Sequence, residues 1–128
     1  MIPIHLQIEG FLSYRERVDL QFTDFDLACI SGSNGAGKSS LLDAITWVLF
    51  GEARRKDDTI INHQSIGAEV ILDFSYENTV YRVQRSKKKN ESTRLEFFIQ
   101  TAEGTCKPLT EATMRATEER IRDTMLLD

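Results

Sequence analysis

The stretch GSNGAGKSSLLDAITWVLF, residues 32–50, decides the fold of this chain. Its first eight residues fit the pattern GxxxxGK[ST] at every required position. Three glycines among residues 32–37 exclude regular structure in that part. From Lys38 onward, apolar residues cover most of a helix circumference, which predicts a helix buried on several sides. Gly51 is the expected end of this helix.

A short apolar run over residues 27–30 precedes the glycines and predicts a strand covered on both faces. A strand, a glycine-rich loop and a helix in this order are the context that a phosphate-binding P-loop requires. A glycine-rich turn that precedes a helix by chance is the alternative, but it leaves the coincident Lys-Ser pair unexplained. We therefore expect a nucleoside triphosphate with Mg²⁺ at this loop.

The chemistry of the loop follows from its residue types. Glycines allow successive backbone amides to point inward, and the helix adds the positive end of its dipole. Lys38 is predicted to be the catalytic residue that contacts the β- and γ-phosphates, while the Ser39 hydroxyl ligates Mg²⁺. The predicted nucleotide contacts are Ser33, Asn34, Gly35, Ala36, Gly37, Lys38, Ser39 and Ser40.

The remaining sequence predicts an α/β fold with antiparallel hairpins. Further strands are expected over residues 2–9, 18–22, 70–76, 80–84 and 95–100, with a polar loop over 52–64 and an amphipathic helix from residue 110. Glu77 and Asn78 are the expected turn of one hairpin. The 128 residues are enough for a single domain.

The composition is that of a soluble globular protein, with 41% apolar and 28% charged residues. The formal net charge of −4 argues against a protein that coats nucleic acid indiscriminately. No apolar run approaches the ~20 residues that cross a bilayer. The N-terminus lacks the pattern of a secretory signal, and the two cysteines are too few for a disulfide framework. These features predict a cytoplasmic protein with no membrane partner.

ATP hydrolysis also needs an acidic residue that holds the metal at the end of a buried strand. Asp73 and Asp128 each follow an apolar run, but neither run has the pattern of a covered strand. The sequence therefore predicts nucleotide binding without the groups that complete hydrolysis.

Beyond the motif, the order of segments resembles the N-terminal half of an ABC-type ATPase head: GFLSYRE, an apolar strand, SGSNGAGKSSLLDAITWVLFGEARR and IINH. The similarity is strongest to the SbcC family of DNA double-strand-break repair ATPases, relatives of the structural-maintenance-of-chromosomes (SMC) proteins and of RecF. It covers essentially residues 1–128, which it identifies as one lobe of a P-loop head. The implied fold is a mixed sheet with antiparallel hairpins around a buried P-loop helix.

The resemblance implies ATP and Mg²⁺ as cofactors and ATP hydrolysis in a dimer of heads. The implied partners are the C-terminal half of the head, a second head, an SbcD-type nuclease and DNA. Asn62 and His63, in IINH, match a segment that lies near the nucleotide in relatives. Where some relatives have a basic residue that contacts the nucleotide, this chain has Leu12.

The same loop is also compatible with other interpretations. A head fragment of the SMC or RecF type, a small P-loop kinase, and a nucleotide-responsive interaction module without enzymatic activity would each use the same loop. Six basic residues in the hairpin over 82–94 are expected to be solvated, with a DNA-backbone contact as the alternative: Arg82, Arg85, Lys87, Lys88, Lys89 and Arg94.

Overall fold

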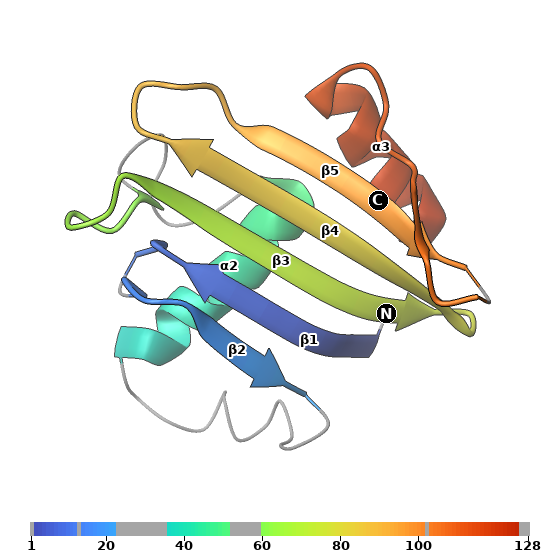
Figure 1. Cartoon of the computed structure of the whole chain (residues 1–128), viewed down its shortest axis with the longest axis horizontal. Coiled ribbons are helices and arrows are strands. Elements are labelled where there is room, and N and C mark those ends of the chain that lie inside the picture. Colours follow the sequence, from blue (N-terminus) through green and yellow to red (C-terminus); the bar gives the residue numbers. More distant parts are fainter. Residues whose placement is uncertain (1, 13, 23–35, 52–59, 102, 126–128) are drawn as a thin grey trace.

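The computed structural model describes residues 2–12, 14–22, 36–51, 60–101 and 103–125. In this part of the chain a six-stranded sheet has the order β2-β1-β3-β4-β5-β6, and all neighbouring strands are antiparallel. The strands are β1 (Ile2–Glu9), β2 (Val18–Gln21), β3 (Gly67–Tyr76), β4 (Thr79–Lys88), β5 (Arg94–Gln100) and β6 (Cys106–Pro108). Two helices, α2 (Ala36–Phe50) and α3 (Met114–Met125), lie on one side of it (Figure 1).

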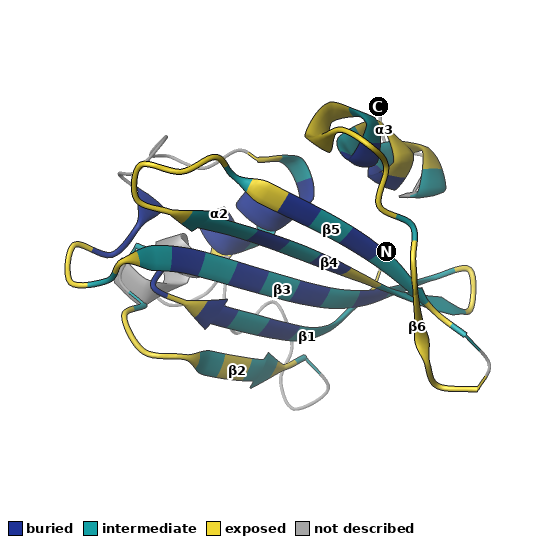
Figure 2. Ribbon diagram, turned by 45° about the horizontal axis from the view of Figure 1, so that its top comes forward, coloured by how far each residue is buried: buried dark blue, intermediate teal, exposed yellow. Residues whose placement is uncertain are grey.

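One face of the sheet forms the core. Leu6, Leu72, Val83 and Phe97 are paired across four successive strands and are completely buried. Because side chains alternate between the two faces of a strand, buried and half-buried residues alternate along β3 (Figure 2). Burial of a large apolar side chain contributes about 1.5–3 kcal/mol, so this row accounts for much of the stability of the sheet.

The hairpin between β3 and β4 confirms the predicted turn. Glu77 and Asn78 both have positive φ, 50° and 63°, and Tyr76 pairs with Thr79. A two-residue turn with two left-handed residues matches the twist of antiparallel strands. The short polar pair Glu-Asn between alternating strands was therefore sufficient to locate this turn.

The second helix begins later than the sequence suggested, at Met114 and not near residue 110. The hydroxyl of Thr110 accepts a hydrogen bond from the backbone N–H of Phe97 at 3.0 Å, which keeps this residue beside the sheet. Thr113 caps α3, since its hydroxyl accepts a hydrogen bond from the N–H of Ala116 at 3.1 Å. The short strand β6, which the sequence did not predict, lies in the preceding connection.

Candidate nucleotide-binding site

The phosphate-loop motif runs into the start of α2. This helix begins at Ala36, two residues earlier than predicted, so the motif residues 36–39 form its first turn. The first N–H groups of a helix have no partner within it, and this turn contains no acidic side chain that would oppose an anion. Ala36, Gly37, Lys38, Ser39 and Ser40 lie in α2, whereas Ser33, Asn34 and Gly35, like the predicted strand over 27–30, lie outside the described residues.

The C-terminal half of α2 is firmly packed. Ala44, Trp47 and Val48 are buried, and the rings of Trp47 and Phe11 have their centroids 5.2 Å apart. The helix ends at Gly51, as predicted, with a φ of 74°. The helix that begins in the motif is therefore fixed to the sheet and to the loop that follows β1.

Asn62, one of the predicted contacts from the IINH segment, connects two loops. Its Nδ2 donates to the carbonyl oxygen of Leu12 at 2.7 Å, and its Oδ1 accepts from the N–H of Gln64 at 2.9 Å. Its own N–H donates to the carbonyl oxygen of Gly10 at 2.7 Å. With the residue only 8% exposed, these bonds give Asn62 a structural role. Any contact with a nucleotide stays a prediction.

His63 and Leu12 have different surroundings from Asn62. His63 is exposed, so its ring is accessible to a ligand. Leu12 packs partly against the core and adopts a φ of 48°, and its N–H donates to the carbonyl oxygen of Ile60 at 2.8 Å. The backbone of Leu12 therefore holds residues 60–62 in place, and its side chain provides no polar contact.

The basic hairpin does not behave as one solvated cluster. Arg85 lies on the core face of β4 and is only 2% exposed, which corrects its interpretation as a solvated or DNA-contacting residue. The sequence did not predict the burial of Arg85, because a charged residue in a half-buried strand is ordinarily on the outer face. Lys88, Lys89 and Arg94 are exposed, as expected of a hairpin tip.

Arg85 contacts both helices. Its Nη1 is 3.0 Å from Glu118 Oε1 of α3, and its Nε donates to the carbonyl oxygen of Val48 in α2 at 3.4 Å. The guanidinium also lies 5.9 Å from the centroid of the Trp47 ring. Burial lowers the pKa of Arg85, and the Glu118 carboxylate opposes this effect. No sequence signal other than the position of Arg85 in the strand alternation pointed to this arrangement.

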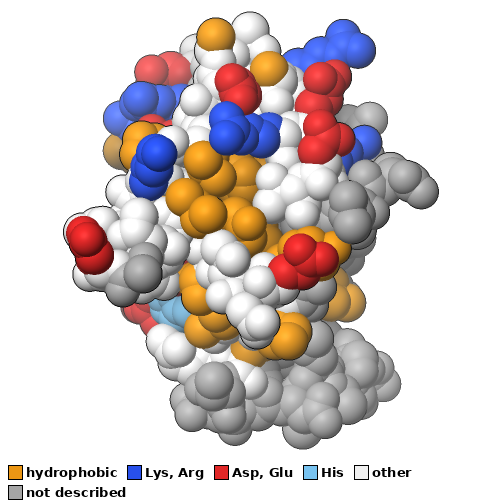
Figure 3. Space-filling view, turned by 90° about the vertical axis from the view of Figure 1, so that its right-hand side faces the viewer, with side chains coloured by type: hydrophobic (Ala, Val, Ile, Leu, Met, Phe, Trp, Pro, Cys, Tyr) orange, Lys and Arg blue, Asp and Glu red, His pale blue; other side chains and the backbone are white. Residues whose placement is uncertain are grey.

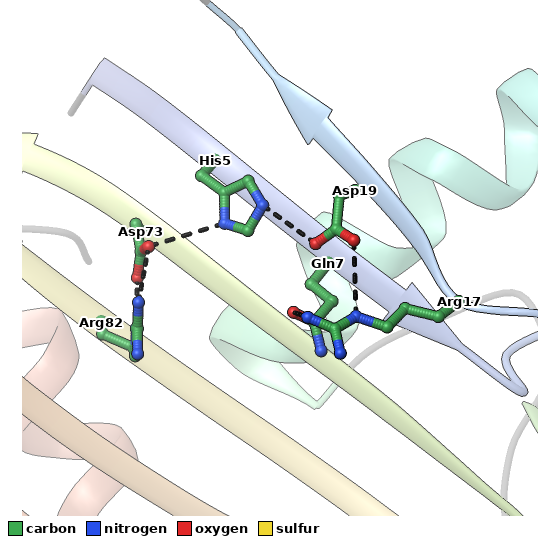
Figure 4. Close-up of polar contacts among 6 residues, drawn as sticks. All are labelled: His5, Gln7, Arg17, Asp19, Asp73 and Arg82. Atoms are coloured by element: carbon green, nitrogen blue, oxygen red, sulfur yellow. Dashed lines mark hydrogen bonds and ion pairs between the residues drawn. The ribbon is translucent and has the colours of Figure 1, made fainter.

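The opposite face of the sheet has a polar network that joins four strands (Figure 4). His5 lies between Asp19 and Asp73, with N–O distances of 3.1 and 3.6 Å. Arg82 donates two hydrogen bonds to the Asp73 carboxylate, at 2.6 and 3.0 Å, and this bonding raises the pKa of Arg82. Arg17 bonds Gln7 at 2.8 Å and lies 3.4 Å from Asp19.

This network has no features of a catalytic metal site. Asp73 engages Arg82 on the face opposite the helices. Among the described residues, no group of three or more histidine, cysteine, aspartate or glutamate side chains is placed to hold a metal ion. Within the same part of the chain, neither helix has the length and hydrophobicity that crossing a bilayer requires.

The fold defines a class, the α/β P-loop head of the ABC type. The fold agrees with that of an SMC head domain from Thermotoga maritima, with a TM-score of 0.63 over 97% of this chain and 42% of that structure, at 23% identity. The chain belongs to the family described as AAA domain, whose model matches residues 5–126.

Sequence relatives agree with the resemblance to SbcC. The chain is 35% identical over 135 residues to the SbcC component of the nuclease SbcCD of Deinococcus radiodurans, and the match covers 100% of this chain and 15% of that protein. It is 34% identical over 90 residues to a probable DNA double-strand break repair Rad50 ATPase of Aquifex aeolicus, covering 66% of this chain and 9% of that protein. The chain thus spans a small part of the length of these relatives.

Proposed function

We propose that this chain is the ATP- and Mg²⁺-binding N-terminal part of an SbcC-like DNA double-strand-break repair ATPase. The observation that carries the proposal is the GxxxxGK[ST] motif at residues 32–39, whose last four residues begin a helix anchored in the core. Lys38 is assigned to the β- and γ-phosphates and Ser39 to Mg²⁺. The loop amides and the start of α2 supply the remaining phosphate contacts.

In this proposal the groups that complete ATP hydrolysis come from outside this chain. The metal-holding aspartate and the general base belong to the C-terminal half of the head, and a second head completes the site. The whole protein would act in the cytoplasm and use ATP to close two heads and regulate a partner nuclease on broken DNA. The chain itself is expected to bind ATP without turning it over.

Apolar surface at one end of the sheet supports a docking site for the C-terminal half. Figure 3 looks at the end where β3 turns into β4 and shows hydrophobic side chains gathered in the middle of the view. Half-buried apolar residues from this part of the fold include Tyr76 in β3, Tyr81 in β4 and Leu109 after β6. Large exposed apolar patches ordinarily mark interaction sites.

The proposal is tested by measuring binding and turnover in the same samples. A fluorescent ATP analogue is titrated with Mg²⁺, and phosphate release from ATP is followed at saturating nucleotide. We expect saturable binding and no more than one turnover per chain. Absence of binding would refute the proposed site, multiple turnovers would refute the incomplete site, and phosphate transfer to nucleosides or nucleotides would favour the kinase interpretation.

A further inference from the structure

Arg85 occupies an unusual position for an arginine. It belongs to a cross-strand row with Ile8, Val70 and Leu95, all of them buried apolar residues on the face that meets the helices. A buried charge is costly unless it is paired, and removal of its partner from a buried pair is strongly destabilising. The guanidinium therefore depends on the Glu118 carboxylate that α3 supplies.

The C-terminal end of α2 lies directly against the Arg85–Glu118 pair. A Cβ at Gly51 would come within 3.0 Å of Arg85 Nη1 and 3.3 Å of Glu118 Oε1, so a glycine here leaves room for the two charged groups. The N–H of Gly51 bonds the carbonyl oxygen of Trp47 at 2.8 Å, and the adjacent carbonyl of Val48 accepts from Arg85. The same guanidinium thus contacts the last turn of the P-loop helix and the middle of α3.

The attachment of α3 depends on few contacts of other kinds. Among its described side chains only Thr117 and Ile121 are buried, and the Arg122 guanidinium lies over the Phe50 ring at 5.5 Å. An element with so little buried apolar surface is among the first to move in a folded protein. The C-terminal end of α2 and α3 lie next to each other at one end of the helix layer (Figure 1).

We propose that Arg85 is a positioning residue that couples α2 to α3. Phosphate binding at the N-terminal end of α2 and the seating of α3 on the sheet are then linked through the Arg85–Glu118 pair. This inference rests on the nucleotide binding proposed above. A helix of 15 residues is a rod about 22 Å long, so a small shift at its first turn reaches its last turn. Arg85 must keep its carboxylate, and it therefore transfers that shift to Glu118.

One nitrogen of the Arg85 guanidinium has no hydrogen-bond partner among the described residues. This nitrogen, Nη2, is buried. A buried donor of this kind normally has a partner, because a buried N–H without a hydrogen bond is destabilising. If a displacement of either helix brings an acceptor to Nη2, the pair gains a second arrangement.

The test measures hydrogen exchange of the α3 amides with and without a non-hydrolysable ATP analogue and Mg²⁺. It compares the wild-type chain with Glu118→Gln and with the control Glu119→Gln, which removes the same charge from the same helix at a position that is 66% exposed and pairs with Arg115. We expect the analogue to slow exchange in α3 by roughly fivefold or more in the wild type and the control, the low end of typical coupling strengths. In Glu118→Gln this effect should fall below about twofold.

Reciprocity gives a second measure of the same coupling. If nucleotide stabilises the seated position of α3, then loss of the coupling in Glu118→Gln lowers the affinity for the analogue by the factor by which the analogue slows α3 exchange in the wild type. Glu119→Gln should leave the affinity unchanged. Arg85→Lys is an independent variant, because a lysine ammonium keeps the charge but has fewer donors and lacks the planar, forked geometry of a guanidinium. It is expected to lose at least half of the exchange effect.

The outcomes separate the two proposals. If the wild-type chain does not bind the analogue, both the site and the coupling are refuted. If it binds but α3 does not respond, or if Glu118→Gln responds as fully as Glu119→Gln, only the coupling is refuted. A purely structural role for the pair would lower the unfolding midpoint of Glu118→Gln and leave the ratio of exchange rates with and without analogue unchanged.

Discussion

Replacement of Asn62 by alanine tests the structural role of this side chain most sharply. Asn62→Ala removes two side-chain hydrogen bonds from a position that is only 8% exposed. Each such bond contributes about 1 kcal/mol, and an acceptor left without a partner adds to the loss. We expect a decrease of about 2–3 kcal/mol in the free energy of unfolding. The corresponding decrease in Tm is roughly 10 °C for a chain of this size.

The assay is urea unfolding followed by the emission of Trp47, the one tryptophan of the chain. His63→Ala is the matched control, because His63 is adjacent in sequence but exposed. Asn62→Ser should be intermediate, since a hydroxyl is able to accept from the N–H of Gln64 but does not reach Leu12. A loss of less than about 0.5 kcal/mol in Asn62→Ala would refute the reasoning.

Three further predictions concern other parts of the structure. In thermal unfolding, Gly10→Ala should destabilise the chain far more than Gly104→Ala. Both glycines have positive φ, but a Cβ at position 10 would collide with the carbonyl oxygen of Gly67, whereas nothing lies within 4 Å of a Cβ at position 104. Equal losses would contradict this account. Asp73→Asn should cost no more than about 1 kcal/mol in urea unfolding, because its Arg82 partner is 44% exposed and the pair is therefore screened by solvent; a loss above about 3 kcal/mol would show that the polar network is required for stability. The exposed thiol of Cys106 should react with a maleimide in the folded chain, and Cys106→Ser should lose this rapid phase; a rapid phase that persists in the variant would assign it to another residue.

Much of the fold was accessible from the sequence because local signals agreed with the final structure. The change of hydrophobic period after the glycines located α2, and the glycine at 51 located its end. The polar pair Glu77 and Asn78 located a turn that requires two left-handed residues. The resemblance to the SbcC family was confirmed by similarity over the whole chain.

The features that sequence reasoning missed depend on contacts between distant residues. Arg85 is separated from Val48 and Glu118 by 37 and 33 positions, respectively, and no neighbouring residue in the sequence indicates these contacts. The start of α3 was placed too early because Thr110 bonds the backbone of β5 instead of beginning a helix. In both cases a tertiary contact overrides the preference of the local sequence.

The proposed function depends on the binding of nucleotide phosphates by residues 32–39. It is tested most directly by titrating ATP with Mg²⁺ into the wild-type chain, Lys38→Ala and the charge-matched control Lys89→Ala, with heat of binding as the signal. We predict that the wild type and Lys89→Ala bind with similar affinity and that Lys38→Ala binds at least about tenfold more weakly, the effect of one lost hydrogen bond to a charged group. Equal affinities for all three proteins would contradict the proposed function.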